Sequence, residues 1–298
     1  MKRASLALAS FVLGASLLGC SAQNRLGLDV AIRTGSYRYA DSDLAYWSAA
    51  PVDAPERLPI VVFLEGDGSQ CQAFSEGMWT RFLKRNTGRF VLVRPRSLVN
   101  TLCASDPRRW AKLDFFHRIE ELDRLLAEVR RAFPLGPVVL LGHSAGAHVA
   151  RLYAERYQDR VAGLIDLSGG LDDLSGVFDD LGEADPQLRA DLSKLAEQAR
   201  TLPSDTELGG RTAAFWSQML DSGVGPLWPS YQKPCLVLHG TDDRESVPFS
   251  GVWRDAKIVE HMGGSCTLEP LEGAGHDTLN AEAFARIDAW IAGQFPAR

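Results

Sequence analysis

The sequence predicts an α/β fold in which a mostly parallel β-sheet is flanked by helices. Two short, fully apolar runs, residues 60–64 and 138–141, are typical of strands that are buried on both faces. Between them, residues 116–133 carry apolar side chains at three- and four-residue spacing, which predicts an amphipathic helix. A strand, a helix and a second buried strand in that order indicate a right-handed crossover in a parallel sheet.

The other elements follow from the same patterns. Alternating polar and apolar residues predict a strand pair within residues 26–47. Helices are expected at residues 74–85 and 116–133, and buried strands at residues 60–64, 89–95, 138–141, 161–167, 235–239 and 267–271.

The composition is that of an ordinary globular protein. Its 298 residues are 45% hydrophobic and 23% charged, which suits one large domain with a sizeable core. The formal net charge of -6 argues against nucleic acid as a partner. No group of His, Cys or Asp residues has the spacing of metal ligands, and no nucleotide-binding loop is present, so we expect neither a metal nor a cofactor.

The first 19 residues have the features of an export signal. Two basic residues precede an apolar run, residues 4–18, that is shorter than a bilayer-spanning helix. The run ends in Leu17-Leu18-Gly19-Cys20, which resembles the bacterial lipobox, where cleavage precedes a cysteine that receives lipid. We therefore predict a signal peptide over residues 1–19 and a lipid on Cys20. Ordinary cleavage after Ala22 and an uncleaved anchor are the alternatives.

This signal also predicts a location. The residue after Cys20 is Ser21 rather than Asp, which by resemblance to enterobacterial sorting implies the outer membrane. We expect the mature chain, residues 20–298, to be a single domain held at the bacterial cell envelope through its lipid anchor, facing the periplasm or the surface.

The run Gly142-His143-Ser144-Ala145-Gly146 stands between a predicted strand and a predicted helix. A sharp turn here forces Ser144 into strained backbone geometry, and Gly142 and Gly146 are needed because a Cβ at either position would collide with the neighbouring chain. The Ser144 hydroxyl is thereby exposed at a helix N-terminus, which favours developing negative charge. This is the pattern of a nucleophile elbow, and the chain resembles the α/β-hydrolase family.

The resemblance implies a catalytic triad in the order Ser, acid, His, with Ser144 as the nucleophile. A strand followed by Gly-x-x-Asp and then Val-Pro matches the family pattern and assigns the acid to Asp243. Asp242 beside it and Asp166 after the preceding strand are the alternatives. His276 follows the last strand among small residues, which let its ring reach over the sheet edge.

The end of the strand at residues 60–64 carries His-Gly-x-Gly in the family, and here it reads Glu65-Gly66-Asp67-Gly68. The resemblance implies an oxyanion hole formed by the backbone N–H groups of Asp67 and Ala145. Because Glu65 replaces the usual His, Gly68 remains an alternative to Asp67, and a tight turn without a catalytic role is a second alternative.

Residues 172–232 differ from the rest of the chain. They show no strand-like run and short helical pieces, and they hold 11 acidic and 4 basic residues. Family members keep a lid at this point, so we expect a helical lid insertion. Its apolar residues either line an acyl pocket or pack the lid onto the core; these are Phe215, Trp216, Met219, Leu227 and Trp228.

Four cysteines remain after Cys20, and in an oxidising compartment this even number suggests two disulfides. Cys235 and Cys266 each stand at the start of a strand, and the resemblance implies that these strands are neighbours. That pairing leaves Cys71 for Cys103. Four buried free thiols are the alternative.

Together these features predict a serine esterase that cleaves a small-molecule carboxylic ester through an acyl-enzyme. A thioesterase or a serine peptidase would use the same residues. A non-catalytic envelope lipoprotein that retains the fold is the alternative from another class.

Overall fold

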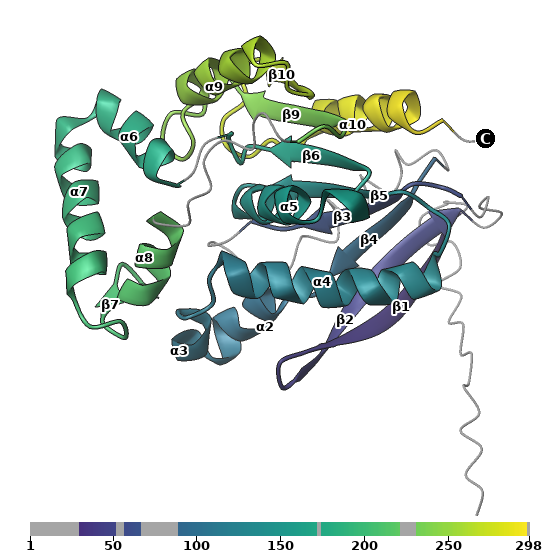
Figure 1. Ribbon diagram of the computed structural model, residues 1–298, viewed down its shortest axis with the longest axis horizontal. Helices are drawn as coiled ribbons and strands as arrows, with labels where there is room; N and C mark the ends of the chain where they lie inside the picture. The colour runs from purple at the N-terminus through teal and green to yellow at the C-terminus, as the bar shows by residue number, and fades with distance from the viewer. Residues whose placement is uncertain (1–29, 52–56, 67–88, 172–173, 221–230, 297–298) are drawn as a thin grey trace, which may run out of the picture.

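The structure, a computed structural model, describes residues 30–51, 57–66, 89–171, 174–220 and 231–296, and it confirms the predicted α/β-hydrolase fold (Figure 1). In these residues, eight strands form one sheet in the order β1-β2-β4-β3-β5-β6-β9-β10. The strands from β4 to β10 in this order are parallel to one another, whereas β1 and β2 form an antiparallel ribbon at one edge.

The strands of the sheet are β1 (Val30–Tyr39), β2 (Ser42–Pro51), β3 (Ile60–Leu64), β4 (Val91–Pro95), β5 (Val138–His143), β6 (Gly163–Leu167), β9 (Cys235–Gly240) and β10 (Cys266–Leu271). The helices of the body are α2 (Leu98–Ser105), α3 (Pro107–Trp110), α4 (Phe115–Ala132), α5 (Ala145–Arg156), the 3-10 turn η1 (Gln158–Arg160), α9 (Phe249–His261) and α10 (Ala281–Gln294).

The central strands are buried on both faces, which explains their continuous apolar sequence. In β3, Ile60, Val62 and Leu64 belong to the core cluster beneath α4 and α5. Val61 and Phe63 belong to a second cluster that α10 covers from the opposite face. Because every residue of β3 is buried, the usual alternation of polar and apolar residues is absent.

The predicted helix at residues 116–133 begins one residue earlier than expected. Asp114 caps α4 by accepting a hydrogen bond from the backbone N–H of His117. As a result Phe115 is buried, whereas Phe116, which we expected in the apolar stripe, is 38% exposed. The other residues expected on the buried face of α4 itself are buried: Ile119, Leu122, Leu126 and Val129.

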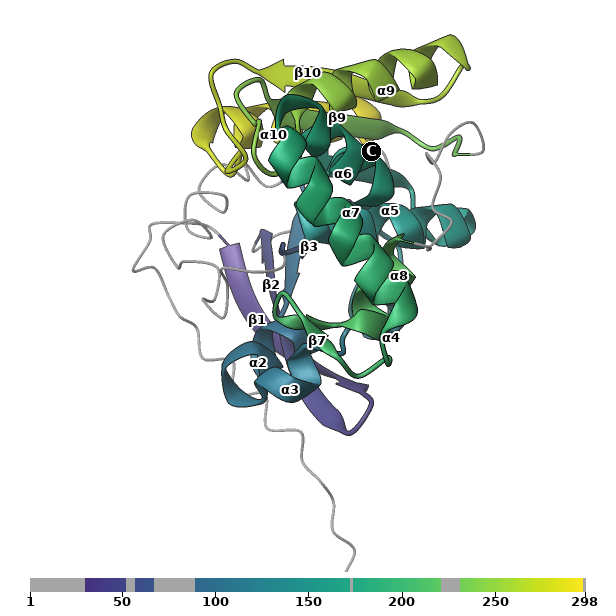
Figure 2. The same cartoon turned by 90° about the vertical axis from the view of Figure 1, so that its left-hand side faces the viewer.

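Residues 174–220 form a separate helical layer. They contain α6 (Leu174–Ala184), α7 (Pro186–Thr201) and α8 (Ala213–Leu220), with a small hairpin of β7 (Glu207–Leu208) and β8 (Arg211–Thr212). The expectation of short helical pieces is wrong for α7, which has 16 residues. Asp185 caps that helix, and a proline in its first turn is compatible with helix initiation. These elements stand beside the edge at which the parallel strands end (Figures 1 and 2).

Among the described residues, contacts at both ends of this helical layer attach it to the body. The Arg211 guanidinium lies 3.6 Å from the ring centroid of Trp110 and 4.4 Å from that of Phe215. At the other end, Arg254 of α9 forms an ion pair with Asp180 of α6 at 2.8 Å. Phe215 and Met219 are buried in the same core cluster as residues of α5. Of the two roles expected for them, an acyl pocket or packing onto the core, they have the packing role.

Cys235 and Cys266 form a disulfide, which confirms that predicted pair. They are register partners at the start of β9 and β10, with their Cα atoms 4.3 Å apart. Cys71 lies outside the described residues, so its bridge with Cys103 stays a prediction.

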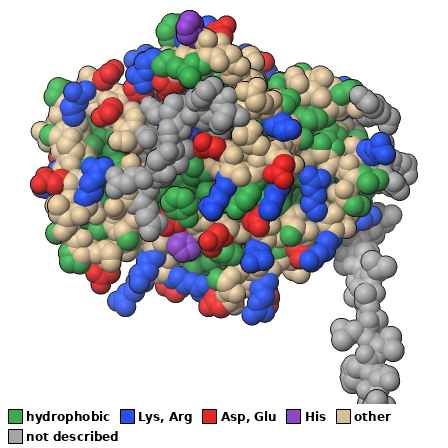
Figure 3. Space-filling model, viewed as in Figure 1, with side chains coloured by type: hydrophobic (Ala, Val, Ile, Leu, Met, Phe, Trp, Pro, Cys, Tyr) green, Lys and Arg blue, Asp and Glu red, His purple; other side chains and the backbone are tan. Residues whose placement is uncertain are grey.

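Other sequence predictions also fall outside the described residues. They concern the signal peptide over residues 1–19, Cys20, the helix at residues 74–85, and the side chains of Leu227 and Trp228. Within the part of the chain that is described, no helix is both long enough and apolar enough to cross a membrane. On the face shown in Figure 3, acidic and basic side chains are interspersed, so neither sign forms a continuous patch there.

Candidate active site

The turn between β5 and α5 has the strained geometry that the sequence predicts. Ser144 is the N-cap residue of α5 with φ 52° and ψ -126°, which a non-glycine residue rarely adopts. A Cβ on Gly142 would lie 2.4 Å from the Cα of Ala147, and one on Gly146 would lie 2.2 Å from the Leu64 carbonyl oxygen. Both glycines are therefore required by close backbone approach.

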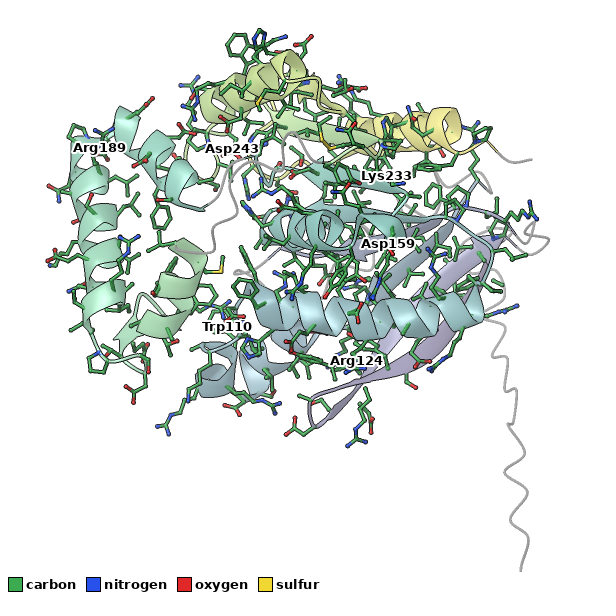
Figure 4. All side chains as sticks on the ribbon, viewed as in Figure 1. Trp110, Arg124, Asp159, Arg189, Lys233 and Asp243 are labelled. Atoms are coloured by element: carbon green, nitrogen blue, oxygen red, sulfur yellow. A yellow bond between two sulfur atoms is a disulfide. The ribbon has the colours of Figure 1, made fainter. Side chains whose placement is uncertain are left out.

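The structure brings the three predicted triad residues together. His276 Nε2 lies 2.9 Å from Ser144 Oγ, and His276 Nδ1 lies 2.7 Å from Asp243 Oδ2. The three residues follow β5, β9 and β10, whose carboxyl ends lie at one edge of the sheet. Asp243 lies on the side of the sheet that faces α6 (Figure 4). The line of contacts joins a hydroxyl, an imidazole and a carboxylate.

Asp243 is held firmly in its charged form. It is 3% exposed, and its Oδ1 accepts hydrogen bonds from the backbone N–H groups of Ser246 and Val247 at 3.2 and 3.3 Å. Burial alone raises the pKa of Asp243, but hydrogen bonds from His239 and His276 outweigh it and hold the pKa well below its usual range. The carboxylate can therefore orient the His276 ring and stabilise its protonated form.

The two alternative acids do not occupy this position. Asp242 is exposed, and its backbone N–H donates to the Ala274 carbonyl. Asp166 is buried, its Oδ1 accepts from the Gly169 N–H at 2.8 Å, and burial raises its pKa to about 6. The contacts of the His276 ring nitrogens favour Asp243.

One half of the predicted oxyanion hole lies beside Ser144. Ala145 is the first residue of α5, and the first N–H groups of a helix have no partner within it. The end of β3 also approaches this point, because a Cβ on Gly66 would lie 3.1 Å from the Cβ of Ser144. The second predicted donor, Asp67, and its alternative, Gly68, lie outside the described residues.

Glu65, which stands in place of the family histidine, is held by two arginines. Its Oε1 accepts from Arg94 Nε and Nη2 at 2.8 and 2.7 Å, and its backbone carbonyl accepts from Arg118 Nη2 at 2.6 Å. The sequence analysis missed both arginines. Arg94 could have been noticed as a single charge within an otherwise apolar strand.

His143 is a further neighbour of the site that the sequence analysis left without a role. Its Nε2 lies 3.4 Å from the His276 carbonyl oxygen, and the two ring centroids are 5.7 Å apart. Burial, followed by the charge of His276, lowers the pKa of His143 to about 4. Its ring is therefore neutral near pH 7. In the described part of the chain, no group of three or more His, Cys, Asp and Glu side chains could hold a metal ion.

This fold and this site define a serine hydrolase of the α/β-hydrolase superfamily. The profile of a family described as serine aminopeptidase, S33, matches residues 103–283, which include Ser144, Asp243 and His276. The match covers more than half of the sequence, and the chain belongs to this family. A search of curated proteins found no match.

Similar solved structures include esterases and a peptidase. Est1E from Butyrivibrio proteoclasticus is 16% identical with a TM-score of 0.61, and the alignment covers 89% of this chain and 99% of that one. A thermostable carboxyl esterase from Bacillus coagulans is 20% identical with a TM-score of 0.65, covering 88% and 98%. Pyrococcus horikoshii acylaminoacyl peptidase is 13% identical with a TM-score of 0.57, covering 88% and 41%. At sequence identities of 13% to 20%, the structural similarity to these proteins establishes the fold.

Proposed function

We propose that this serine hydrolase cleaves carboxylic esters through a covalent acyl-enzyme on Ser144. The observation that carries the proposal is the continuous contact from Ser144 Oγ through both nitrogens of His276 to Asp243, with distances of 2.9 and 2.7 Å. A serine hydroxyl is a weak nucleophile, and an adjacent base oriented by a carboxylate is what activates it.

Acylation begins at Ser144. His276 Nε2 removes the hydroxyl proton as Ser144 Oγ attacks the carbonyl carbon, and Asp243 holds the proton on Nδ1 and stabilises the imidazolium. The backbone N–H groups of Ala145 and Asp67 bind the oxyanion, and each contributes about 3 to 4 kcal/mol to transition-state stabilisation. His276 then returns its proton to the leaving alcohol as the carbon–oxygen bond breaks.

Deacylation repeats these steps with water. His276 removes a proton from a water molecule, whose oxygen attacks the acyl carbon. As the second tetrahedral intermediate collapses, the proton passes to Ser144 Oγ, and the carboxylic acid leaves. Each half-reaction therefore returns His276 to its neutral form, and deacylation also restores the Ser144 hydroxyl.

The names of the similar solved structures bear on the choice of substrate. Two of the similar structures are named as esterases, but one is named as an acylaminoacyl peptidase. A serine peptidase is the second candidate, because the family is described as a serine aminopeptidase. A thioester would engage the same groups.

We also propose that the protein is an envelope lipoprotein and that residues 172–232 act as a lid. The apolar run before Cys20 supports the first proposal. The position of α6 to α8 beside the strand ends supports the second (Figure 2). Incorporation of labelled palmitate into the full-length chain, but not into its Cys20→Ala variant, is the expected outcome; equal labelling would contradict a lipid on Cys20.

Hydrolysis of p-nitrophenyl acetate and butyrate by a soluble form starting at Ser21 tests the enzymatic proposal. We expect Ser144→Ala to lower kcat by about four orders of magnitude or more. Equal rates for the two proteins would contradict catalysis by Ser144. A matched panel of esters, thioesters and peptides with the same acyl group then decides the substrate class, and a higher kcat/KM for peptides would select the peptidase.

A further inference from the structure

A buried pair of hydroxyls links two loops that lie on either side of the candidate triad. Ser168 Oγ and Thr278 Oγ1 are 2.7 Å apart, although the residues are separated by 110 positions in the sequence. Both residues are 0% exposed. Breaking a hydrogen bond between two fully buried hydroxyls is costly, because each group is left desolvated without a partner. The bond therefore restricts movement of the two loops relative to each other.

Ser168 is tied to the nucleophile side of the site. It directly follows Leu167, whose carbonyl accepts the backbone N–H of Ser144 at 2.8 Å. The backbone N–H of Ser168 donates to the Leu238 carbonyl in the neighbouring strand at 3.0 Å. Ser168 also has a φ of 55°, a conformation that persists in a non-glycine residue only where the surroundings impose it.

Thr278 is tied to the base side. Its backbone N–H donates to the His276 carbonyl at 3.0 Å. The segment before His276 is anchored separately, because Thr241 Oγ1 accepts the Gly273 N–H at 2.9 Å and the Ala274 carbonyl accepts the Asp242 N–H at 2.9 Å. The Ser168–Thr278 bond holds the segment that follows His276.

We propose that Ser168 and Thr278 are positioning residues that fix His276 relative to Ser144. Neither side chain touches the reacting atoms; they act by joining the Ser144–Leu167 contact to the His276 loop through one buried hydrogen bond. Proton transfer across the 2.9 Å contact between Ser144 and His276 depends on this alignment. A displacement of about 1 Å can lower the rate about 100-fold. The inference rests on the proposed role of the triad.

Thr278→Val tests it, because valine keeps the shape of threonine and removes the hydroxyl. We expect kcat for p-nitrophenyl butyrate to fall about 10- to 100-fold while KM changes by less than about twofold. Ser168→Ala should have the same effect. The double variant should be about as slow as the slower single variant, because both changes remove one shared contact. Thr278→Ser, which keeps a hydroxyl, should restore most of the rate.

The rate of covalent labelling by a fluorophosphonate separates this inference from the substrate proposal. The reagent reacts with an activated serine whatever acyl group the enzyme prefers. Wild type should be labelled and Ser144→Ala should not, and the labelling rate of Thr278→Val should be lower than that of wild type by about 10-fold or more. A wild type that does not label would overturn both the proposed function and this inference.

Thermal unfolding and a matched control exclude a simple loss of folded protein. Ser48 is also buried but lies on β2, so Ser48→Ala removes a buried hydroxyl away from the site. We expect it to keep wild-type labelling per folded molecule. Thr278→Val and Ser168→Ala would overturn the inference if they kept at least about half of the wild-type labelling rate, or if their losses merely matched their unfolded fractions.

Discussion

At the scale of single residues, the carboxylate of Asp243 is the group whose replacement is most informative. Asp243→Asn keeps the size of the side chain but presents an amide that favours the wrong tautomer of His276. We predict that kcat falls by about four orders of magnitude while KM changes little. Steady-state kinetics with p-nitrophenyl butyrate measure this effect.

Asp242 and Asp166 provide the matched controls for this substitution. Asp242→Asn alters an exposed side chain and should change kcat by less than about threefold. Asp166→Asn alters a buried side chain that accepts from Gly169, so its effect should fall mainly on stability. A larger loss of kcat in either control than in Asp243→Asn would move the acid to that residue.

Glu121 predicts a pH dependence of stability. Burial raises the pKa of this carboxyl from 4.5 to about 7, although the hydrogen bonds from Tyr37 and from the Leu98 N–H act to lower it. Between these pH values the folded protein keeps a proton that the unfolded chain has released, so rising pH lowers the free energy of unfolding. Glu121→Gln lacks this titration. We predict that the free energy of unfolding of Glu121→Gln, taken relative to that of wild type, rises by about 3 kcal/mol between about pH 5 and pH 8.

Urea unfolding of both proteins across this range checks the prediction, since other titrating groups cancel in the difference. A difference between Glu121→Gln and wild type that stays constant from about pH 5 to pH 8 would show that Glu121 keeps an ordinary pKa.

Residues near the site differ in how far the sequence could predict them. Ser144 and its two glycines form a local motif, and Asp243 and His276 follow recognisable strand ends. Ser168 and Thr278 carry no local signal, because each hydroxyl is explained only by a partner 110 positions away. Arg118, which binds the Glu65 carbonyl, also lacks a local signal, whereas Arg94 stands out as a single charge in the apolar strand β4.

At the scale of elements, the disulfide joins the first residues of β9 and β10. Its cysteines are 31 positions apart, and the constraint on the unfolded chain corresponds to about 3 to 4 kcal/mol. We predict that Cys235→Ala with Cys266→Ala lowers the free energy of unfolding by this amount in urea. With a reductant present, wild type and the double variant should unfold at the same urea concentration. Equal unfolding curves for the two proteins without reductant would contradict a bridge in the folded protein.

The attachment of the α6–α8 layer makes a second prediction at this scale. Arg211 stacks on Trp110 and Phe215 and donates to the backbone carbonyls of Trp110 and Leu113. We predict that Arg211→Ala increases chymotrypsin cleavage within residues 174–220 about tenfold, because local opening becomes easier. Lys194→Ala, on the exposed side of α7, is the control. Unchanged cleavage in Arg211→Ala would show that this contact does not hold the layer.

The elements of the sheet were predictable because each buried strand is a short apolar run. The helical layer was less predictable. Its longest helix, α7, buries Ala199 alone, so an apolar stripe does not mark that helix clearly. The exposure of Phe116 was also not predictable from the apolar spacing. The cap at Asp114 decides where α4 begins, and Phe115 is the buried residue of its first turn.

At the scale of the whole molecule, the order of the strands explains why residues far apart in the sequence meet. β5, β6, β9 and β10 are consecutive in the sheet and run in the same direction, so the loops after them share one edge. Ser144 and His276, the proposed nucleophile and base, follow the strands at opposite ends of this group, with β6 and β9 between them. The fold could be predicted from the sequence, whereas the contacts across these loops depend on the assembled sheet.

The central claim is that Ser144 carries the acyl group during turnover. Wild-type protein mixed with p-nitrophenyl butyrate, quenched in acid within the first turnovers and digested, should yield a butyrylated peptide in which Ser144 is the modified residue. The same peptide should be unmodified in Ser144→Ala and strongly depleted of butyrate in His276→Ala. Turnover by wild type with the butyryl group on a different residue, or undiminished turnover by Ser144→Ala, would contradict the account.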